Sequence, residues 1–143
     1  MICKILLPVD GSEGSSNAAR HVAHFAAMML HGVEVHLLNV QPPGDDWMVR
    51  RMIKAEELAA LEKDWGEAAI EPARSILEAA GVSCQTHIVQ GEVAQTIAHL
   101  AQELGCDQIM MGSHGRSALG DLLLGSVAVK VLHLSSVPVT LVK

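Results

Sequence analysis

The chain has 143 residues, a length that suits one domain with a hydrophobic core of its own. Half of its residues are hydrophobic, yet no uninterrupted apolar run approaches the roughly 18 residues that a membrane-spanning helix requires. The formal net charge of −6 disfavours nucleic-acid binding, which needs a basic surface. With few cations to spare, a polyanionic ligand would have to be held by main-chain N–H groups, helix ends and a divalent cation.

The opening residues, MICKILLPVD, lead directly into an apolar run and lack the successive regions of a signal peptide, so we expect a cytoplasmic protein. Its three cysteines, Cys3, Cys84 and Cys106, are widely spaced and without a paired C-x-x-C motif. This pattern favours small buried side chains over a disulfide or zinc framework.

Apolar, β-branched runs alternate with helical patterns along the whole chain. Strands are predicted at residues 4–9, 33–40, 83–89, 108–111 and 137–142. Helices are predicted at residues 15–31, from Asp45 or Asp46 to Ala80, and at 92–104 and 126–134. Gly32 is expected to stop the first helix, and Pro72 predicts a kink or two abutting helices within the second.

This order predicts an α/β fold over residues 1–143: a single open five-stranded parallel sheet with helices on both faces. Ligands of such sheets bind beyond the carboxyl ends of the strands, where the strand order reverses. If the order is 3-2-1-4-5, the first and fourth strands flank that point. Asp10 and the glycine-containing loop after residue 111 then face each other across it.

A glycine pattern follows the fourth predicted strand. Gly112 and Gly115 are three residues apart, and Gly125 precedes Ser126 at the head of the last predicted helix. Glycine permits positive φ and close approach of a ligand to the main chain, and a helix amino terminus favours phosphate. The spacing alone would occur by chance in roughly 4 of 100 chains of this length. Its alternative interpretation is a strand-ending turn followed by a helix cap.

On these residues the chain resembles the ATP-binding branch of the universal stress protein family. The resemblance covers nearly the whole chain, through KILLPVDGSEGS, VHLLNV, GEVAQTIAHLAQELGCDQIMMGSHGRS and VPVTLVK. The family's Gly-x2-Gly-x9-Gly-Ser/Thr motif is met by Gly112, Gly115, Gly125 and Ser126. The resemblance implies a Rossmann-like fold of the adenine-nucleotide α-hydrolase type.

The resemblance also implies a site for ATP or another adenine nucleotide, with a Mg²⁺ or Mn²⁺ ion bridging the phosphates and held mostly by phosphate oxygens and water. It places Asp10 and Pro8 against the adenine and ribose, and the main chain of Val40 at the adenine edge. It assigns the ribose and phosphates to Met111, Gly112, Ser113, His114, Gly115, Arg116, Ser117 and Ala118, and the phosphate chain to Gly125, Ser126, Val127 and Ala128.

Family members usually dimerise through the last strand. Residues 137–142 fit this role, because Pro138 cannot donate to a β-ladder and belongs on an edge. The resemblance thus implies a cytoplasmic homodimer in which nucleotide occupancy biases conformation or partner contact during stress. We expect slow ATP hydrolysis or none, because no residue stands out as a general base. The alternatives are an interaction module of the same fold without nucleotide, and an ATP-hydrolysing or adenylyl-transferring enzyme.

Several residues have two possible roles. Ser113 and His114 do not form a Gly-x-Ser-x-Gly elbow, and neighbouring side chains on a tight loop seldom meet in catalytic geometry, so a phosphate-lining loop is favoured. Arg116 is expected to contact phosphate, or otherwise a surface acid. Asp10 could instead cap the first helix.

The two tryptophans, Trp47 and Trp65, fall within the second predicted helix at a spacing consistent with one face. We expect them to pack against the protein rather than to stack on a ligand.

Overall fold

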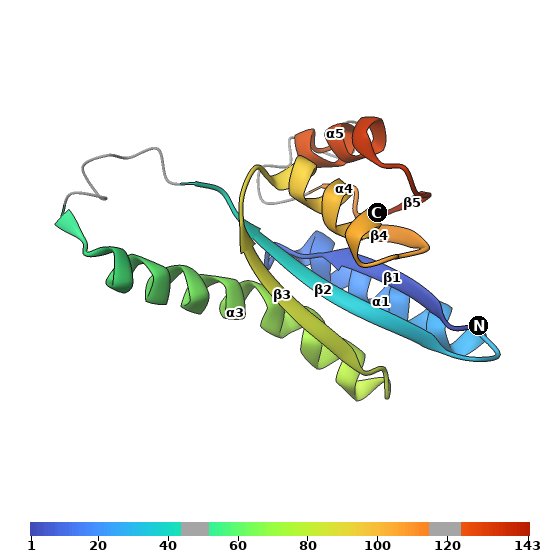
Figure 1. Ribbon diagram of the computed structural model, residues 1–143. Coiled ribbons are helices and arrows are strands. Elements are labelled where there is room, and N and C mark those ends of the chain that lie inside the picture. Colours follow the sequence, from blue (N-terminus) through green and yellow to red (C-terminus); the bar gives the residue numbers. More distant parts are fainter. Residues whose placement is uncertain (44–51, 115–123) are drawn as a thin grey trace.

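The computed structural model describes residues 1–43, 52–114 and 124–143 (Figure 1). In these ranges strands and helices alternate as predicted. They are β1 (Cys3–Pro8), α1 (Glu13–Met28), β2 (Val33–Gln41), α3 (Ala55–Ala79), β3 (Cys84–Gln90), α4 (Val93–Glu103), β4 (Gln108–Gly112), α5 (Ser126–Leu134) and β5 (Val139–Val142).

The five strands form one sheet in the order β3-β2-β1-β4-β5, and every pairing is parallel. This confirms the predicted fold class and strand order. The central strands are buried on both faces because helices cover each side, which is why their sequences are apolar without alternation. In β1 the residues Ile5, Leu6 and Leu7 are all fully buried.

Two hydrophobic clusters lie on opposite faces of the sheet (Figure 1). On one face α1 packs against α3 over Ile5 and Leu7, and on the other α4 packs against α5 over Leu6 and Leu38. Consecutive strand residues therefore serve different cores, as the two-residue period of a strand requires. No helix among the described residues is both long and apolar enough to cross a membrane.

Helix α1 ends three residues before the predicted boundary at His31. Met29 already has extended backbone angles, and Gly32 takes the positive φ of 75° that turns the chain into β2. Leu30, which falls within the predicted helix at residues 15–31, is 90% exposed in this turn. Apolar residues recur with helical spacing beyond the end of α1, so their spacing could not show where the helix ends.

Helix α3 begins at Ala55, after Lys54 as its N-cap. The predicted start at Asp45 or Asp46 lies outside the described residues. A single helix contains Pro72, so the alternative of two abutting helices is wrong.

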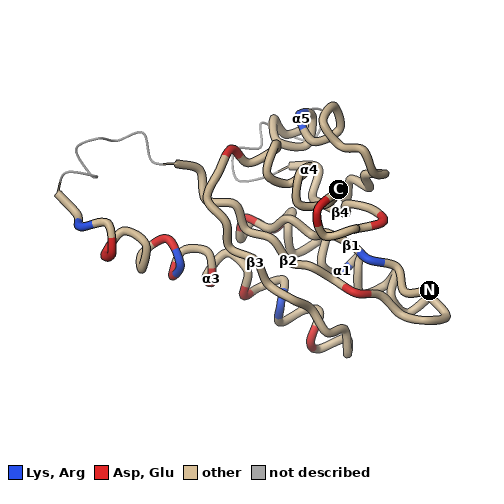
Figure 2. The backbone as a smooth tube through the Cα atoms, in the orientation of Figure 1, with Lys and Arg blue, Asp and Glu red and all other residues tan. Residues whose placement is uncertain are grey.

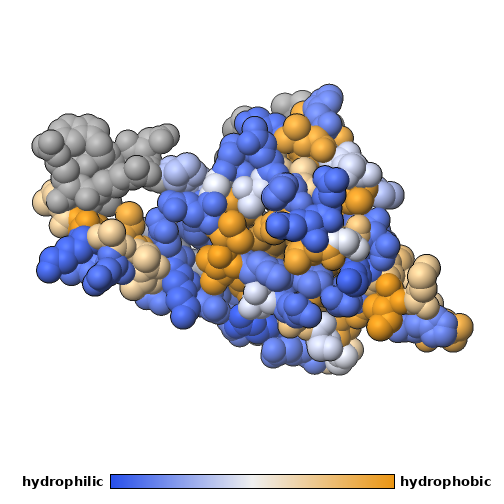
Figure 3. Space-filling view, viewed as in Figure 1, coloured by the Kyte–Doolittle hydropathy of each residue, from blue (hydrophilic) through white to orange (hydrophobic). Residues whose placement is uncertain are grey.

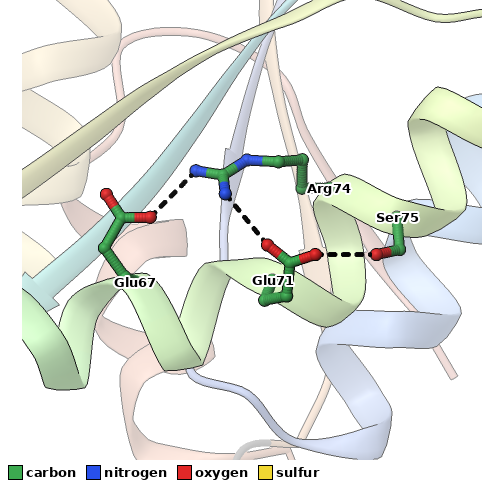
Figure 4. Close-up of polar contacts among 4 residues, drawn as sticks. All are labelled: Glu67, Glu71, Arg74 and Ser75. Carbon is green, nitrogen blue, oxygen red and sulfur yellow. Dashed lines mark hydrogen bonds and ion pairs between the residues drawn. The ribbon is translucent and has the colours of Figure 1, made fainter.

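Pro72 has no N–H to donate to the Ala68 carbonyl one turn earlier. Side chains bridge this part of α3: Arg74 donates to Glu67 at 3.1 Å and to Glu71 at 2.9 Å, and the Ser75 hydroxyl donates to Glu71 (Figure 4). The hydrogen bond that Arg74 donates to Glu67 is the main cause of the raised pKa of the Arg74 guanidinium. These contacts tie together the residues on either side of the proline.

Strand β5 starts at Val139, two residues after the predicted Val137. The Ser135 hydroxyl donates to the Val137 carbonyl at 2.7 Å and accepts from the Val137 N–H at 3.1 Å, which forms a local turn. Within the described sheet β5 pairs only with β4, so it is an edge strand.

The three cysteines are free thiols; Cys106 is buried as expected, whereas Cys3 and Cys84 are only partly buried against the core. Cys106 is buried, and desolvation raises the pKa of its thiol to about 11. A thiol with that pKa is unreactive near neutral pH, so Cys106 acts as a small core residue.

Candidate functional site

A cleft of about 770 Å³ opens at the carboxyl ends of β1, β2 and β4. It is lined by segments that are far apart in the sequence, including both sides of the point where strand order reverses. All of the predicted site residues that the structure describes line it: Pro8, Asp10, Val40, Met111, Gly112, Ser113, His114, Gly125, Ser126, Val127 and Ala128. The structure thus brings the predicted residues together in one cavity.

Four predicted residues, Gly115, Arg116, Ser117 and Ala118, lie outside the described residues. Their expected contacts with ribose and phosphate stay predictions. No lysine or arginine is present among the described residues that line the cleft. Positive potential there comes from main-chain N–H groups and the helix dipole.

Asp10 holds the first turn of α1 as well as lining the cleft. Its Oδ1 accepts from the Ser12 N–H and from the Ser15 hydroxyl, both at 2.9 Å. Ser12 is the N-cap residue and accepts from the Ser15 N–H at 3.3 Å. The tight turn depends on Gly11, whose φ of 81° is unfavourable for other residues. The capping role considered for Asp10 is therefore present, and the carboxylate remains at the cleft.

The end of β4 is fixed by main-chain hydrogen bonds on both sides. The Ser113 N–H donates to the Val142 carbonyl, and its carbonyl accepts from the Gly125 N–H, each at 2.8 Å. Ser113 is only 2% exposed. These bonds join the end of β4 to β5 and to the start of α5, so the loop ends are held at the cleft.

The Ser113 hydroxyl lies 2.8 Å from Nδ1 of His114, so these neighbouring side chains are in hydrogen-bond contact. The Nε2 atom of His114 is buried and has no hydrogen-bond partner among the described residues. A hydrolase triad needs a third group that orients the histidine through its second nitrogen. The described residues supply none, so the pair lacks that arrangement. Buried, unpaired polar atoms are costly and usually mark a missing ligand or water.

Two glycines of the motif, Gly112 and Gly125, do not have the positive φ that the sequence analysis considered. Gly125 has a φ of −62° as the N-cap of α5, and Gly112 is not among the described glycines with positive φ. Gly112 is instead required by close packing, because a Cβ there would lie 2.9 Å from the main chain of Gly14. A Cβ on Gly14 would lie 2.3 Å from the His114 carbonyl oxygen. Gly14 was not identified from the sequence, because there it is only one more glycine after Asp10.

The amino terminus of α5 faces the cleft through Gly125, Ser126, Val127 and Ala128. Its N-cap is Gly125, which provides no side-chain acceptor. The first N–H groups of a helix have no partner within the helix. Together with the helix dipole they form a surface that favours an anion.

Val40 presents main-chain polar groups at the end of β2. The Val9 N–H donates to the Leu38 carbonyl, and the Gly91 N–H donates to the Gln41 carbonyl. Because successive strand residues direct their main-chain groups to opposite neighbours, Val40 points toward the β1 side, as Leu38 does. The β1 ladder ends at Pro8 opposite Leu38. The N–H and C=O of Val40 therefore lie beyond the end of that ladder, at the cleft.

Two amide side chains that the sequence analysis missed line the same end of β2. Asn39 is buried and donates from Nδ2 to the Val9 carbonyl at 2.8 Å, and Gln41 donates to Asn39 Oδ1. A polar amide inside an apolar strand was the signal that could have identified Asn39.

The remaining lining residues were also missed, and most are apolar. They are Val9, Ser15, Leu38, Pro42, Trp65, Ala68, Ala69, Val93 and Ile97. Trp65 contradicts the expectation of packing, because its side chain is at the cleft and the residue is 53% exposed. Trp47 lies outside the described residues.

The described residues contain no group of three or more His, Cys, Asp or Glu side chains that could hold a metal ion. Asp10 is the carboxylate that lines the cleft among them. This donor set fits a divalent ion held chiefly by a ligand's phosphate oxygens and water, in line with the preference of Mg²⁺ for that environment.

Comparison with known proteins identifies the family of the chain. The universal stress protein family model matches residues 1–143. Universal stress protein YxiE of Bacillus subtilis is 32% identical over 150 aligned residues, which cover 100% of both chains. The structure of protein MJ0577, a universal stress protein of Methanocaldococcus jannaschii, has a TM-score of 0.84 and 35% identity, and covers 100% of this chain and 96% of that one.

A universal stress protein from Archaeoglobus fulgidus, solved in complex with dAMP, has a TM-score of 0.68 and 23% identity, and covers 100% of this chain and 98% of that one. At that identity the likeness establishes the fold.

Proposed function

The chain belongs to the universal stress protein family, and from this premise we propose that it binds an adenine nucleotide, ATP, in the cleft at the carboxyl ends of its strands. One observation carries the proposal. Every described residue that the family motif and strand ends predict for the nucleotide lines a single cavity of about 770 Å³. That volume lies within the roughly 300–1,000 Å³ typical of small-molecule sites.

The proposal assigns the base to the β2 side of the cleft. The Val40 N–H and C=O offer a donor and an acceptor to the adenine edge, and Pro8 and Leu38 supply apolar surface. Asp10 accepts from the ribose hydroxyls while its Oδ1 continues to hold Ser12 and Ser15.

The phosphates belong at the amino terminus of α5. The N–H groups of Ser126, Val127 and Ala128 and the Ser126 hydroxyl donate to phosphate oxygens. The buried Nε2 of His114 gains its missing partner there, because the Ser113 hydroxyl can donate to Nδ1 and leave the proton on Nε2. A Mg²⁺ or Mn²⁺ ion, bridging phosphate oxygens, supplies the positive charge that the lining side chains lack. We also assign Arg116 to the phosphates, as the sequence analysis expects.

We further propose that the protein is a cytoplasmic homodimer in which nucleotide occupancy regulates contact with a partner during stress. The edge strand β5 can add a second copy, because Pro138 and Val142 direct their carbonyls to β4 and leave the main chain of Leu141 facing outward. Beside it, α5 exposes Val129, Leu132 and Leu134, and apolar surface gathers over α5 in Figure 3.

Calorimetry with ATP and Mg²⁺ tests the nucleotide proposal. The unmodified protein should release binding heat, and Gly125→Val should lose it, because a branched side chain would occupy the space at the start of α5. His99→Ala, an exposed change on α4, should bind ATP normally. The absence of heat from the unmodified protein would leave only the interaction module without nucleotide. Parallel titrations with ADP and AMP establish which nucleotide is preferred.

Two measurements test the remaining parts. Sedimentation should show a dimer that Leu132→Glu weakens and that His133→Glu, on the same exposed turn, leaves intact. Labelled ATP incubated with pure protein should yield little or no ADP, AMP or pyrophosphate. Rapid turnover would favour the enzyme alternative.

A further inference from the structure

We propose that Trp65 stacks on the base of the bound nucleotide and so makes the cleft selective for aromatic bases. The inference rests on the proposed nucleotide site and extends it to a residue on α3 that neither the glycine motif nor the strand ends include. Trp65 lines the cleft, yet the residue is 53% exposed. A large aromatic side chain left in water at a cavity has surface available for a ligand.

The neighbours of Trp65 on α3 keep that surface open. Ala68 and Ala69 follow at i+3 and i+4, which places them on the same face of the helix, and both line the cleft. Because alanine side chains are short, these two residues fill little of the cleft beside Trp65. Leu61, four residues earlier and 37% exposed, does not line the cleft. Along α3, the lining of the cleft therefore begins at Trp65.

The position of α3 determines which part of a nucleotide meets Trp65. The proposed phosphate site is at the end of β4 and the start of α5, whereas α3 packs on β2 and β3. β4 and β2 are separated by β1, so their ends are about 10 Å apart at the usual spacing of neighbouring strands. The ribose fills that interval, and the base reaches the α3 side.

Charge supports the same orientation. Between Ala55 and Ala79, α3 carries seven acidic and two basic residues, and Figure 2 shows acidic positions along the helix. Glu62, Asp64 and Glu67 are all within three residues of Trp65. Phosphates are repelled from such a helix, whereas an uncharged base is not. An aromatic side chain in that setting provides stacking, the sequence-tolerant contact that bases make with protein.

Intrinsic tryptophan fluorescence tests the proposal directly, because replacing one of the chain's two tryptophans leaves a single indole to observe. In a Trp47→Phe background Trp65 is the remaining indole. ATP with Mg²⁺ should change its emission and shield it from acrylamide quenching. Adenosine should shield it to the same extent at saturation, and inorganic triphosphate should not.

Affinity provides the second measurement. Trp65→Ala should weaken ATP and adenosine binding by a similar factor, about tenfold, whereas Trp65→Phe should retain most of the affinity. Leu61→Ala is the matched control and should bind like the unmodified protein. Circular dichroism verifies that each variant is folded.

The outcomes separate the two proposals. If the unmodified protein binds no adenine nucleotide, the proposed function and this inference both fail. If it binds ATP but Trp65→Ala has the same Kd and ATP leaves the indole emission and quenching unchanged, only the role of Trp65 is overturned. Equal shielding by inorganic triphosphate would also overturn it, since that ligand has no base.

Discussion

The two sides of the cleft are built in different ways. Where β4 ends and α5 begins, the lining is main chain, held by the hydrogen bonds of Ser113 and by the close contact between Gly14 and Gly112. On the α3 side the lining is side chain, with Trp65 next to two alanines. We call these the main-chain wall (residues 112–114 and 125–128) and the side-chain wall (residues 65, 68 and 69).

Because of this difference, the two walls should contribute differently to the stability of the protein and to its choice of ligand. The main-chain wall joins α1, β4, β5 and α5, so a change in it disturbs packing between elements as well as any bound anion. In the side-chain wall Ala69 is buried but Trp65 is exposed, so a change of Trp65 should cost little stability. We expect substitutions in the main-chain wall to affect folding and phosphate binding, and a substitution of Trp65 to affect binding of the base without affecting folding.

The largest effect is expected for Gly14→Ala in the main-chain wall. Alanine usually stabilises a helix relative to glycine by about 0.5–1 kcal/mol, but here its Cβ would lie 2.3 Å from the His114 carbonyl oxygen. Overpacking should reverse the sign and lower the free energy of unfolding by about 1–3 kcal/mol. Urea unfolding with unchanged m-value measures this, and equal or greater stability than the unmodified protein would contradict it.

The next effect concerns His114, within the same wall. His114→Phe removes the buried Nε2 and should weaken ATP binding by at least about tenfold, because one hydrogen bond to a charged group contributes about 1.5–3 kcal/mol. Adenosine binding should be unchanged, because the contact is to phosphate. Equal weakening of ATP and adenosine would show that the substitution acts through the base side instead.

A smaller loss of stability is expected at low pH. It comes from two histidines on β2 and β3, the strands on which α3 packs. His36 Nδ1 lies 2.9 Å from His87 Nε2, and His36 Nε2 lies 2.8 Å from Glu34 Oε1. Burial, and then the proximity of His36, lower the pKa of His87 below its usual 6.5. The unfolded chain then binds more protons, so stability is full above pH 6.5 and declines as the pH falls toward the folded-state value.

Urea unfolding between pH 7.5 and 5 measures this decline, and His87→Gln should reduce its slope. Replacement of the exposed Gln102 by Ala, which changes no titratable group, should leave the slope as it is. A slope that is the same with and without His87 would rule out this cause.

The smallest effect is expected on the outer surface of α3. Arg74→Met removes the contacts with Glu67 and Glu71 that span Pro72, and exposed pairs of this kind contribute about 0.2–1 kcal/mol. The free energy of unfolding should fall by that amount, less so in high salt, while ATP affinity stays the same. A marked loss of ATP affinity would show that these contacts position the side-chain wall.

The sequence predicted much of the main-chain wall because its signals are local. Ser126 heads α5, as predicted, and Gly112 closes β4. Of the two reasons given for the glycines, positive φ does not hold for Gly112 and Gly125, because a glycine's spacing does not distinguish a positive φ from a close contact. Only the partner, Gly14, about a hundred residues away, makes that distinction.

By itself the sequence determined the element types and the parallel pairing of the strands, whereas the strand order entered as a condition that the structure meets. The element types and the pairing depend on the periodicity and order of residues along the chain, which no distant contact alters. Tertiary structure alone decided that Trp65 stands at the cleft and that Leu30 is left in a turn, although both fit an apolar helix face. Burial depends on what covers a face, and the covering elements come from other parts of the chain.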